Sequence, residues 1–296
     1  MGDYGKSIFV REDNEESDTK RALYQTLLQL SSVELRRQRV QMAKGNVERW
    51  AAARQAKKGQ PTLVVPCHDW GDATRALTER FGVTFAVLNI ANARSFGGGY
   101  EEGMMAQEEN MFARSSCHFF DVSLTNQVTC HSRGRYTREM HDLLSATEGR
   151  VYLDSQNPRV CVTGSKQNGY RTLADDSVFP FYELRAAAVD MRGSSPTSFD
   201  EGELSKRIVA QLDTCREQGV RHVVLSAFGC GAFQNPPEIV APAYRKALVG
   251  READFDVVAF AIFYAGYGPA TNYDTFAEVF GEKDVMEGWS VEFKKV

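Results

Sequence analysis

The chain has 296 residues and a mass of 33.1 kDa, with 43% hydrophobic and 25% charged residues. This is an ordinary globular composition, long enough to bury a large core, and it excludes disordered, collagen-like and low-complexity classes. The formal net charge is −4, whereas protein surfaces that bind nucleic acid are basic. We therefore expect no direct sequence-specific binding of nucleic acid.

No apolar run approaches the ~18–20 residues of a membrane helix. The acidic, polar start of the chain differs from a secretory signal. We therefore expect no membrane association and a cytoplasmic location, with export as an effector through a non-standard signal as the alternative.

Residues 1–17 are acidic and predict a flexible tail. From residue 18 onward the pattern is helical, because Leu23, Leu27 and Leu30 recur at i, i+4 and i+7.

A second helix is expected to begin at Ser31, because Ser31 and Glu34 have the spacing of a capping box. The stretch 57–61, which contains glycine and proline, ends it. Residues 18–60 thus form a helical segment. It is either an arm that contacts a substrate or partner, or, as we favour, an accessory layer packed on the core.

After this segment, short apolar runs alternate with helical stretches. The runs predict strands at 62–65, 83–90, 159–162, 222–227 and 257–263. Helical patterns occur at 72–80, 104–115, 200–218 and 236–249. Such alternation predicts an α/β domain over residues 61–296, whose sheet is covered by helices on both faces. Residues 119–158 are polar and predict a long insertion or helical excursion.

Unusual residues follow four of the predicted strands. They are the segments 67–69, 92–99, 228–233 and 265–268. Ligands of open α/β sheets bind beyond the carboxyl ends of the strands, so these four segments predict one cleft.

The strand at 83–90 leads into three consecutive glycines, Gly97, Gly98 and Gly99. Glycine tolerates positive φ and lets a ligand touch the backbone, and such a turn exposes N–H groups that bind phosphate oxygens. By itself, however, a triple glycine is more often a flexible turn.

Seven residues separate Gly99 from the sequence Gln107-Glu108-Glu109, which stands near the start of a predicted helix. Adjacent helix residues point about 100° apart. The two glutamates should therefore have different tasks, one as a proton donor and the other as a ligand of a sugar hydroxyl. Complementing the helix dipole would explain one glutamate, but not the glycine turn beside it.

A second glycine turn, 229–233, follows the strand at 222–227. Pro236 and Pro237 then open a helix whose N-terminus would face the same anion. Two glycine turns at neighbouring strand ends suit a diphosphate better than a single phosphate. The chain contains neither a Gly-x-x-x-x-Gly-Lys-Ser/Thr loop nor a Gly-x-Gly-x-x-Gly sequence that opens a helix.

The order Gly-Gly-Gly, seven residues, Gln-Glu-Glu resembles the signature of the poly(ADP-ribose) glycohydrolases, which are macrodomains. Gly-Cys-Gly-Ala-Phe-Gln-Asn-Pro-Pro resembles the second loop of the microbial branch of that family. The resemblance covers about residues 62–280, and the first 60 residues match no family that we recognise. It implies a three-layer, macrodomain-like mixed sheet with helices on both faces, plus N-terminal accessory helices.

By this resemblance Glu109 is the general acid, which protonates the leaving oxygen of the ribose–ribose bond and then deprotonates the incoming water. Glu108 would hold hydroxyls of the cleaved ribose. The ADP-ribose-binding residues that the resemblance implies are Asn92, Gly97, Gly98, Gly99, Gln107, Gly229, Cys230, Gly231, Ala232, Phe233, Asp69 and Tyr264.

The adenine end of this set has alternatives. Asp69 is placed to accept from the adenine amino group, and an N-cap of the next helix is an equal alternative for it. Phe263, Tyr264 or Tyr267 would stack on the base, with core packing as the alternative.

The resemblance implies a hydrolase that cleaves glycosidic bonds of ADP-ribose attached to protein. Its partners would be ADP-ribosylated proteins or poly(ADP-ribose), and its product would be ADP-ribose. The enzyme would act as a monomer without a cofactor. The acidic stretches 101–102 and 175–176, if they line the mouth of the site, would favour an arginine guanidinium and hence a mono-ADP-ribosyl-arginine hydrolase. Solvated loop residues are the favoured interpretation of both stretches.

A non-catalytic reader and a phosphatase are the alternatives from other function classes. A non-catalytic ADP-ribose-binding macrodomain would have no need of the intact Gln-Glu-Glu. A phosphatase would use Cys230 as its thiolate, but no arginine follows within that loop.

The six cysteines form no Cys-x-x-Cys pair, and reduced thiols are expected. Cys117-His118 and Cys130-His131 repeat at a spacing that suggests zinc. Adjacent cysteine and histidine cannot easily bring both heads to one ion, so packing is favoured over a metal site.

Overall fold

The computed structural model describes residues 12–53, 61–119, 130–131, 135–194, 199–264, 271–281 and 288–294. Predictions for residues 1–11, the helix end at 54–60, most of 119–134, the segment 265–268 and Tyr267 lie outside these described residues. Its helices are α1 (Glu12–Leu30), α2 (Val33–Ala53), α3 (Trp70–Phe81), α4 (Gln107–Arg114), α6 (Arg138–Leu144), α7 (Glu201–Glu217), α8 (Pro237–Leu248) and α9 (Thr271–Gly281). Its strands are β1 (Thr62–Pro66), β2 (Ala86–Ile90), β3 (Cys130–His131), β4 (Arg135–Tyr136), β5 (Tyr152–Cys161), β6 (Phe179–Ala186), β7 (His222–Leu225), β8 (Val257–Phe260) and β9 (Ser290–Lys294).

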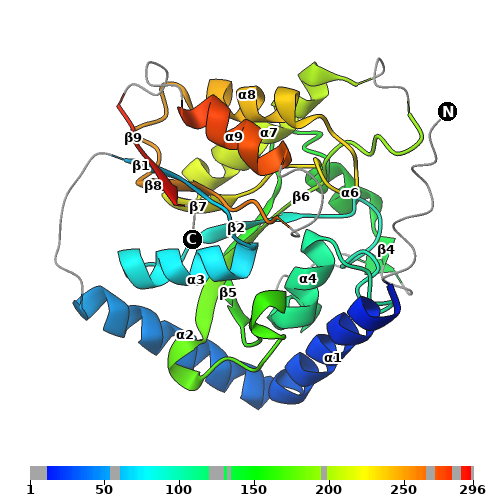
Figure 1. Ribbon diagram of the computed structural model, residues 1–296, viewed down its shortest axis with the longest axis vertical. Coiled ribbons are helices and arrows are strands. Elements are labelled where there is room, and N and C mark those ends of the chain that lie inside the picture. Colours follow the sequence, from blue (N-terminus) through cyan, green and yellow to red (C-terminus); the bar gives the residue numbers. More distant parts are fainter. Residues whose placement is uncertain are drawn as a thin grey trace.

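The described residues form a seven-stranded sheet in the order β5-β6-β2-β7-β8-β1-β9. Every neighbouring pair is parallel except β5 and β6, so the sheet is mixed. Helices α7, α8 and α9 cover one face, and α2, α3 and α4 lie on the other (Figure 1). This confirms the α/β class and the three-layer, macrodomain-like arrangement.

The strands bury both of their faces. In β2, Ala86 and Leu88 join the apolar cluster that includes α7 and α8, whereas Val87 joins the cluster that includes α3 and α4. Strands β7 and β8 divide their side chains between the two clusters in the same alternating way. Burial on both sides explains why these strands read as continuous apolar runs in the sequence.

The strands that the sequence missed have physical reasons. Strand β6 contains Glu183 and Arg185, both wholly buried, so it lacks a continuous apolar run. The strand predicted at 159–162 covers only the end of β5, which begins at Tyr152 inside the predicted insertion. The first half was missed because it is polar and mostly half-buried. The described part of that insertion also contains β4 and α6.

The N-terminal helices pack on the domain. Helix α1 begins at Glu12, so the predicted tail is helical from that residue onward. Its Leu23 shares a buried cluster with Met111 of α4, and the Thr26 hydroxyl lies 2.7 Å from that of Thr163. In α2 the Asn46 amide donates to two carbonyl oxygens next to β6, each at 2.8 Å.

The start of α2 differs by one residue from the expected capping box. The amide of Leu35 donates to the Ser32 hydroxyl at 3.1 Å, so Ser32 is the N-cap. Ser31 instead donates to the Leu28 carbonyl of the preceding helix at 3.4 Å. Two adjacent serines offer the same side chain, and only the direction of the chain between the helices selects one.

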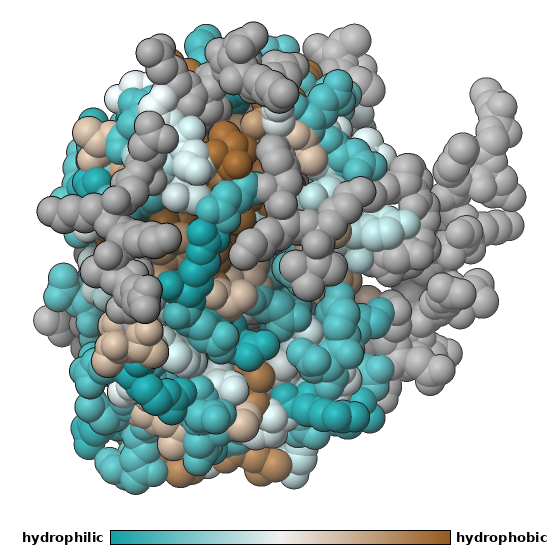
Figure 2. All heavy atoms as spheres, turned by 60° about the vertical axis from the view of Figure 1, so that its left-hand side comes forward, coloured by the Kyte–Doolittle hydropathy of each residue, from teal (hydrophilic) through white to brown (hydrophobic). Residues whose placement is uncertain are grey.

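Hydrophilic residues cover most of the lower part of the face seen in Figure 2, and apolar residues gather in a smaller area above. Within the described ranges, no helix combines the length and the apolar character needed to cross a bilayer.

The packing of α3 on α2 yields the first testable prediction. Gly82 ends α3 at φ +63°, and a Cβ there would lie 2.5 Å from the Ala51 Cα of α2. Gly219 ends α7 at φ +70° with nothing within 4 Å. Gly219→Ala should therefore cost only the left-handed conformation, about 1–2 kcal/mol. Gly82→Ala should lower the free energy of unfolding by clearly more, as measured by urea titration; equal losses would contradict this packing.

Candidate active site

The two glycine turns lie at the same edge of the sheet. Strands β2 and β7 are parallel neighbours, so the segments that follow them, 91–99 and 226–233, leave the sheet side by side. Strands β8 and β1 continue the parallel set, which brings the segments that follow them to this edge too. The described parts of these segments therefore lie at the edge of the sheet where the sequence predicts a cleft.

The sheet opens between β2 and β7 at this edge. Their ladder includes only Ala86 and Val87 of β2. Beyond it, the Gln107 side chain donates to the Leu88 carbonyl at 2.6 Å and accepts from the Ile90 amide at 2.9 Å. The Gln107 side chain thus makes the hydrogen bonds to this part of β2 that β7 does not make, and it fixes the start of α4 against β2. The side-chain amide of Gln107 is thus engaged with the backbone of β2, and its substrate-binding role stays a prediction.

The next side chain, Glu108, is bound to the same connection. It is 3% exposed, and its Oε2 accepts from the Asn92 amide at 2.7 Å. Its Oε1 is buried without a hydrogen-bond partner among the described residues. An unpaired buried carboxylate oxygen is costly, which makes it available to a ligand hydroxyl.

Burial raises the pKa of the Glu108 carboxyl well above its ordinary range. The Asn92 amide and the Arg185 guanidinium act in the opposite direction, and the neighbouring carboxylates Glu109 and Glu183 add to the rise. The carboxyl therefore keeps its proton to a higher pH than a solvent-exposed glutamate does.

Glu109 is 8% exposed, and its Oε1 accepts from the Gly99 amide at 3.1 Å. Gly98 adopts φ +60°, and a Cβ there would overlap Glu109 Oε1 and lie 3.3 Å from Glu108 Oε2. The absence of a side chain at Gly98 is thus what allows both carboxylates to reach the turn. Gly97 adopts φ +72°, and a Cβ there would lie 2.5 Å from the Tyr100 ring and 2.7 Å from the Phe112 ring.

Asn92 shapes the connection that the glutamates hold. Its Oδ1 accepts from the amides of Arg94 and Ser95 at 2.8 and 2.9 Å, while its own amide donates to Glu108. The side-chain oxygen of Asn92, a residue predicted to bind ADP-ribose, is therefore engaged in a turn.

The second turn is braced by Asn235. Gly229 adopts φ +76°, and a Cβ there would lie 2.7 Å from both Ala188 and the Asn235 amide nitrogen. That side-chain nitrogen donates to the Val189 carbonyl at 2.7 Å, and the backbone amide of Asn235 donates to the Gly229 carbonyl. Gly231, by contrast, faces open space.

Cys230 is unsuited to be a nucleophile in this setting. Burial raises the pKa of its thiol to about 12, so it stays protonated near neutrality. A protonated thiol argues against the phosphatase alternative, since only a thiolate attacks phosphate. In the same turn, Ala232 is exposed and Phe233 is half-buried.

Arg192, which the sequence analysis missed, connects the two turns. Its guanidinium lies 5.2 Å above the Phe233 ring and is paired with Asp190 at 2.6 Å. It also interacts electrostatically with Glu109. The amide of Met191 donates to the Phe233 carbonyl at 3.0 Å. No sequence signal singles out this pair, because it lies in a loop after the unrecognised strand β6.

Asp69 is an N-cap. Its Oδ1 accepts from the amides of Gly71 and Asp72, and from the guanidinium of Arg114 at 3.0 Å. Arg114 is 1% exposed and lies 5.0 Å from the Trp70 ring. The structure thus supports the N-cap alternative for Asp69.

The aromatic side chains after β8 are exposed. Phe263 is 45% and Tyr264 37% exposed, so core packing is wrong for both. They follow a strand whose carboxyl end belongs to the site edge, where a flat apolar ligand could stack on them.

The acidic stretch 175–176 lies away from the site. It precedes β6 and faces α2, where Asp175 pairs with Arg39 at 2.7 Å and the Asp176 carbonyl accepts from Arg49. It therefore does not line the mouth of the site. Glu101 and Glu102 are exposed in the connection between the glycine turn and α4.

Within the described ranges, no group of three or more histidine, cysteine or acidic side chains could hold a metal ion. Cys117 is buried, and His118 Nδ1 lies 2.8 Å from the Tyr100 hydroxyl, so this Cys-His pair is used in packing. The side chains of the second pair lie outside the described residues.

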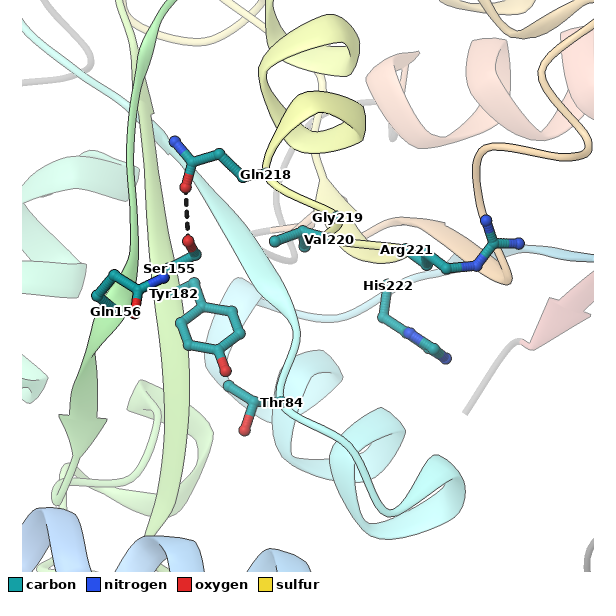
Figure 3. Close-up of a pocket in the computed structure, with 9 residues that line it drawn as sticks. All are labelled: Thr84, Ser155, Gln156, Tyr182, Gln218, Gly219, Val220, Arg221 and His222. Carbon is teal, nitrogen blue, oxygen red and sulfur yellow. Dashed lines mark hydrogen bonds between the residues drawn. The ribbon is translucent and has the colours of Figure 1, made fainter.

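A polar hollow of about 290 Å³ lies at the opposite, amino edge of the sheet (Figure 3). Thr84, which precedes β2, and His222, the first residue of β7, help to line it. Ser155 donates across it to Gln218 at 2.6 Å. It is therefore separate from the glycine turns.

Residues 4–149 match the model of the family described as "Microbial-type PARG, catalytic domain". This segment, just under half of the chain, is similar to the catalytic domain of that family. The match contains the first glycine turn and the Gln107-Glu108-Glu109 sequence, while the second turn lies beyond it. It also begins at residue 4, which corrects the interpretation that the first 60 residues fall outside the resemblance.

Solved structures of bacterial enzymes share the fold. The poly(ADP-ribose) glycohydrolase of Thermomonospora curvata is 22% identical with a TM-score of 0.61, over 89% of this chain and 100% of that one. The enzyme of Deinococcus radiodurans in complex with ADP-ribose is 22% identical with a TM-score of 0.58, over 83% of this chain and 92% of that one. No curated protein matches the sequence.

The raised pKa of Glu108 predicts a pH-dependent stability difference. A carboxyl whose folded-state pKa lies above its unfolded value stabilises the fold below the unfolded pKa, and this contribution is lost as the pH rises through the folded pKa. Glu108→Gln removes the ionisable group and keeps an oxygen to accept from Asn92. Its melting temperature should therefore exceed that of the parent protein at about pH 8 and approach it at about pH 4.

Differential scanning calorimetry across this pH range measures the difference. Glu102→Gln, at an exposed position of the same connection, is the control and should follow the parent protein. A Glu108→Gln variant less stable than the parent at every pH would show that the carboxylate is favoured by its surroundings.

Proposed function

We propose that this protein is a glycosidase that hydrolyses ADP-ribose from modified proteins, as a poly(ADP-ribose) glycohydrolase does. Its substrates would be ADP-ribosylated proteins or poly(ADP-ribose), its product ADP-ribose, and its place of action the cytoplasm, as a monomer. The family match and the shared fold support the reaction class. The observation that carries it is the contact of Glu109 with the Gly98–Gly99 backbone, which places an acid beside a turn fit for phosphate and ribose.

In this proposal the diphosphate binds the two glycine turns through their amides, with the open side of Gly231 and the Phe233 ring next to it. Asn92 and the glycines 97–99 surround the ribose whose anomeric carbon reacts. Asp69, through its second carboxylate oxygen, and Tyr264 are the proposed contacts of adenine. Gln107 contributes by holding α4 on β2.

Glu109 in its acid form donates its proton to the leaving oxygen as the bond from that oxygen to the anomeric carbon breaks. Positive charge develops on the ribose, and the diphosphate and Glu108 stabilise it. Water then attacks the anomeric carbon and gives its proton to the Glu109 carboxylate, which restores the acid. Glu108 accepts from a ribose hydroxyl through its unpaired Oε1.

Replacing the acid tests this assignment. Glu109→Gln keeps an oxygen that accepts from the Gly99 amide but has no proton to give. Release of ADP-ribose from auto-modified polymer should fall by about 10²–10⁴-fold, whereas ADP-ribose binding measured by calorimetry should persist. Glu201→Gln, at an exposed position in the first turn of α7, is the matched control. Unchanged turnover in Glu109→Gln would remove this residue from its role.

The open space at Gly231 provides a test of the second turn. Gly231→Leu meets no atom within 4 Å, so the fold should tolerate it, yet the side chain would occupy the proposed diphosphate position. ADP-ribose affinity should fall at least about tenfold. Gly45→Leu, in α2 with equally open surroundings, is the control and should bind normally. Normal binding by Gly231→Leu would place the diphosphate elsewhere.

The second candidate within this class is a mono-ADP-ribosyl-arginine hydrolase. It is favoured by the exposed carboxylates of Glu101 and Glu102 near the glycine turn, which suit a guanidinium. A panel of polymer and of arginine-, serine- and glutamate-linked ADP-ribose, followed by loss of label, separates the candidates. Polymer release with retention of the arginine label would exclude the second candidate. Binding of ADP-ribose without release from any substrate would identify a reader.

A further inference from the structure

A wholly buried cation lies behind the two glutamates. Arg185 of β6 is 0% exposed. Its Nε and Nη2 donate to Glu183 Oε1 at 2.9 and 2.7 Å, and its Nη1 donates to the Tyr136 hydroxyl at 2.6 Å. A buried arginine with this many charge-assisted bonds holds its guanidinium in one orientation.

Aromatic rings surround this guanidinium. Phe96, immediately before Gly97, lies 5.2 Å from it, and Phe112 of α4 lies 5.7 Å from it. The two rings contact each other edge to face at 4.8 Å. Tyr136 and Tyr152 complete the surroundings at 5.9 and 5.4 Å.

These contacts join the parts of the site that must not move apart. Phe96 belongs to the glycine connection, and Phe112 follows Glu109 by one helical turn. Arg185 therefore touches the turn and the acid-bearing helix together and anchors both to the sheet. Cation–π contacts in a buried setting are worth more than exposed ones, because no water competes for the cation.

We propose that Arg185 is a positioning residue of the active site, which keeps the glycine turn against α4 and sets the surroundings of the Glu108 carboxyl. The inference rests on the proposed function for its meaning in catalysis. Its geometric part, an ion held between the turn, the helix and β6, stands independently of the reaction.

The charges around Glu108 make this effect measurable. Arg185 and Glu183 face it from β6, Tyr136 from β4, and Glu109 from its own helix. Arg185 is the cation of this group, and it opposes the rise in the Glu108 pKa that burial causes. Without it, Glu108 should stay protonated to a higher pH, and its role as an acceptor of a ribose hydroxyl should be lost earlier on acidification.

The chain offers a matched control. Arg159 of β5 is also buried and also pairs with Glu183, through Oε2 at 3.2 Å. Its other ion pair is with Asp154 of its own strand at 3.4 Å. Loss of either arginine removes one cation from the same carboxylate, but Arg185 is the one placed against Phe96 and Phe112.

The experiment compares Arg185→Met, Arg185→Lys and Arg159→Met in the full chain. We expect the acid limb of the pH–rate profile for ADP-ribose release to rise by about one pH unit in Arg185→Met, and less in Arg185→Lys, which keeps the charge. The kcat should fall about tenfold or more in both, because the flat guanidinium that contacts the rings is lost. Arg159→Met should keep the limb in place.

A carbon-13 NMR titration of the Glu108 carboxyl, assigned with Glu108→Gln, gives a readout that needs no turnover. If the parent protein released ADP-ribose from no substrate, the proposed function would fail, and this titration would still decide the role of Arg185. Phe96→Leu, which leaves every ionisable group in place, should lower kcat without moving the Glu108 titration, even if Arg185→Met failed to fold. A Glu108 titration in folded Arg185→Met that equals those of Arg159→Met and the parent protein, or a normal kcat in Phe96→Leu, would overturn the inference.

Discussion

Three consecutive side chains at the start of α4 hold the backbone that precedes them. Gln107 completes the open edge of β2, Glu108 accepts from the amide of Asn92, and Glu109 accepts from that of Gly99. Because adjacent helix residues point about 100° apart, the three reach different points along one connection. The glycine turn and the Gln-Glu-Glu sequence are therefore one structural unit, and Gly98 is the position where a side chain would separate them.

The rest of the site depends on where the sheet opens. The ladder between β2 and β7 stops after Val87, so the two glycine turns diverge there and α4 fits its N-terminus into the gap. Arg192 and Asn235 then bind the loop after β6 to the second turn. The carboxylates are buried, yet each is anchored by backbone amides, which lets an acidic pair persist in an apolar setting.

Several features could be predicted from local sequence, and others could not. Strands β1, β2, β7 and β8 were recognised because both of their faces are apolar. Strand β6 was missed because it contains Glu183 and Arg185, which interrupt the apolar pattern expected of a buried strand. The two side chains are buried because they pair with each other. The alternatives for Asp69 could not be separated either, since its partner Arg114 lies 45 residues away in sequence. The contacts of Gln107 with β2 could not be predicted for the same reason, because Leu88 and Ile90 lie 19 and 17 residues away in sequence.

The sequence alone determined the fold class, the two glycine turns and the pair of glutamates, because each depends on periodicity or on the chemistry of neighbouring residues. Only the tertiary structure decided which polar groups are already engaged. It paired Asp175 with Arg39 away from the site, enclosed Arg185 among aromatic rings beneath the glutamates, and left one oxygen of Glu108 unpaired. Such partnerships join residues far apart in the chain, and the free energy of a buried charge depends on the neighbours that folding brings to it.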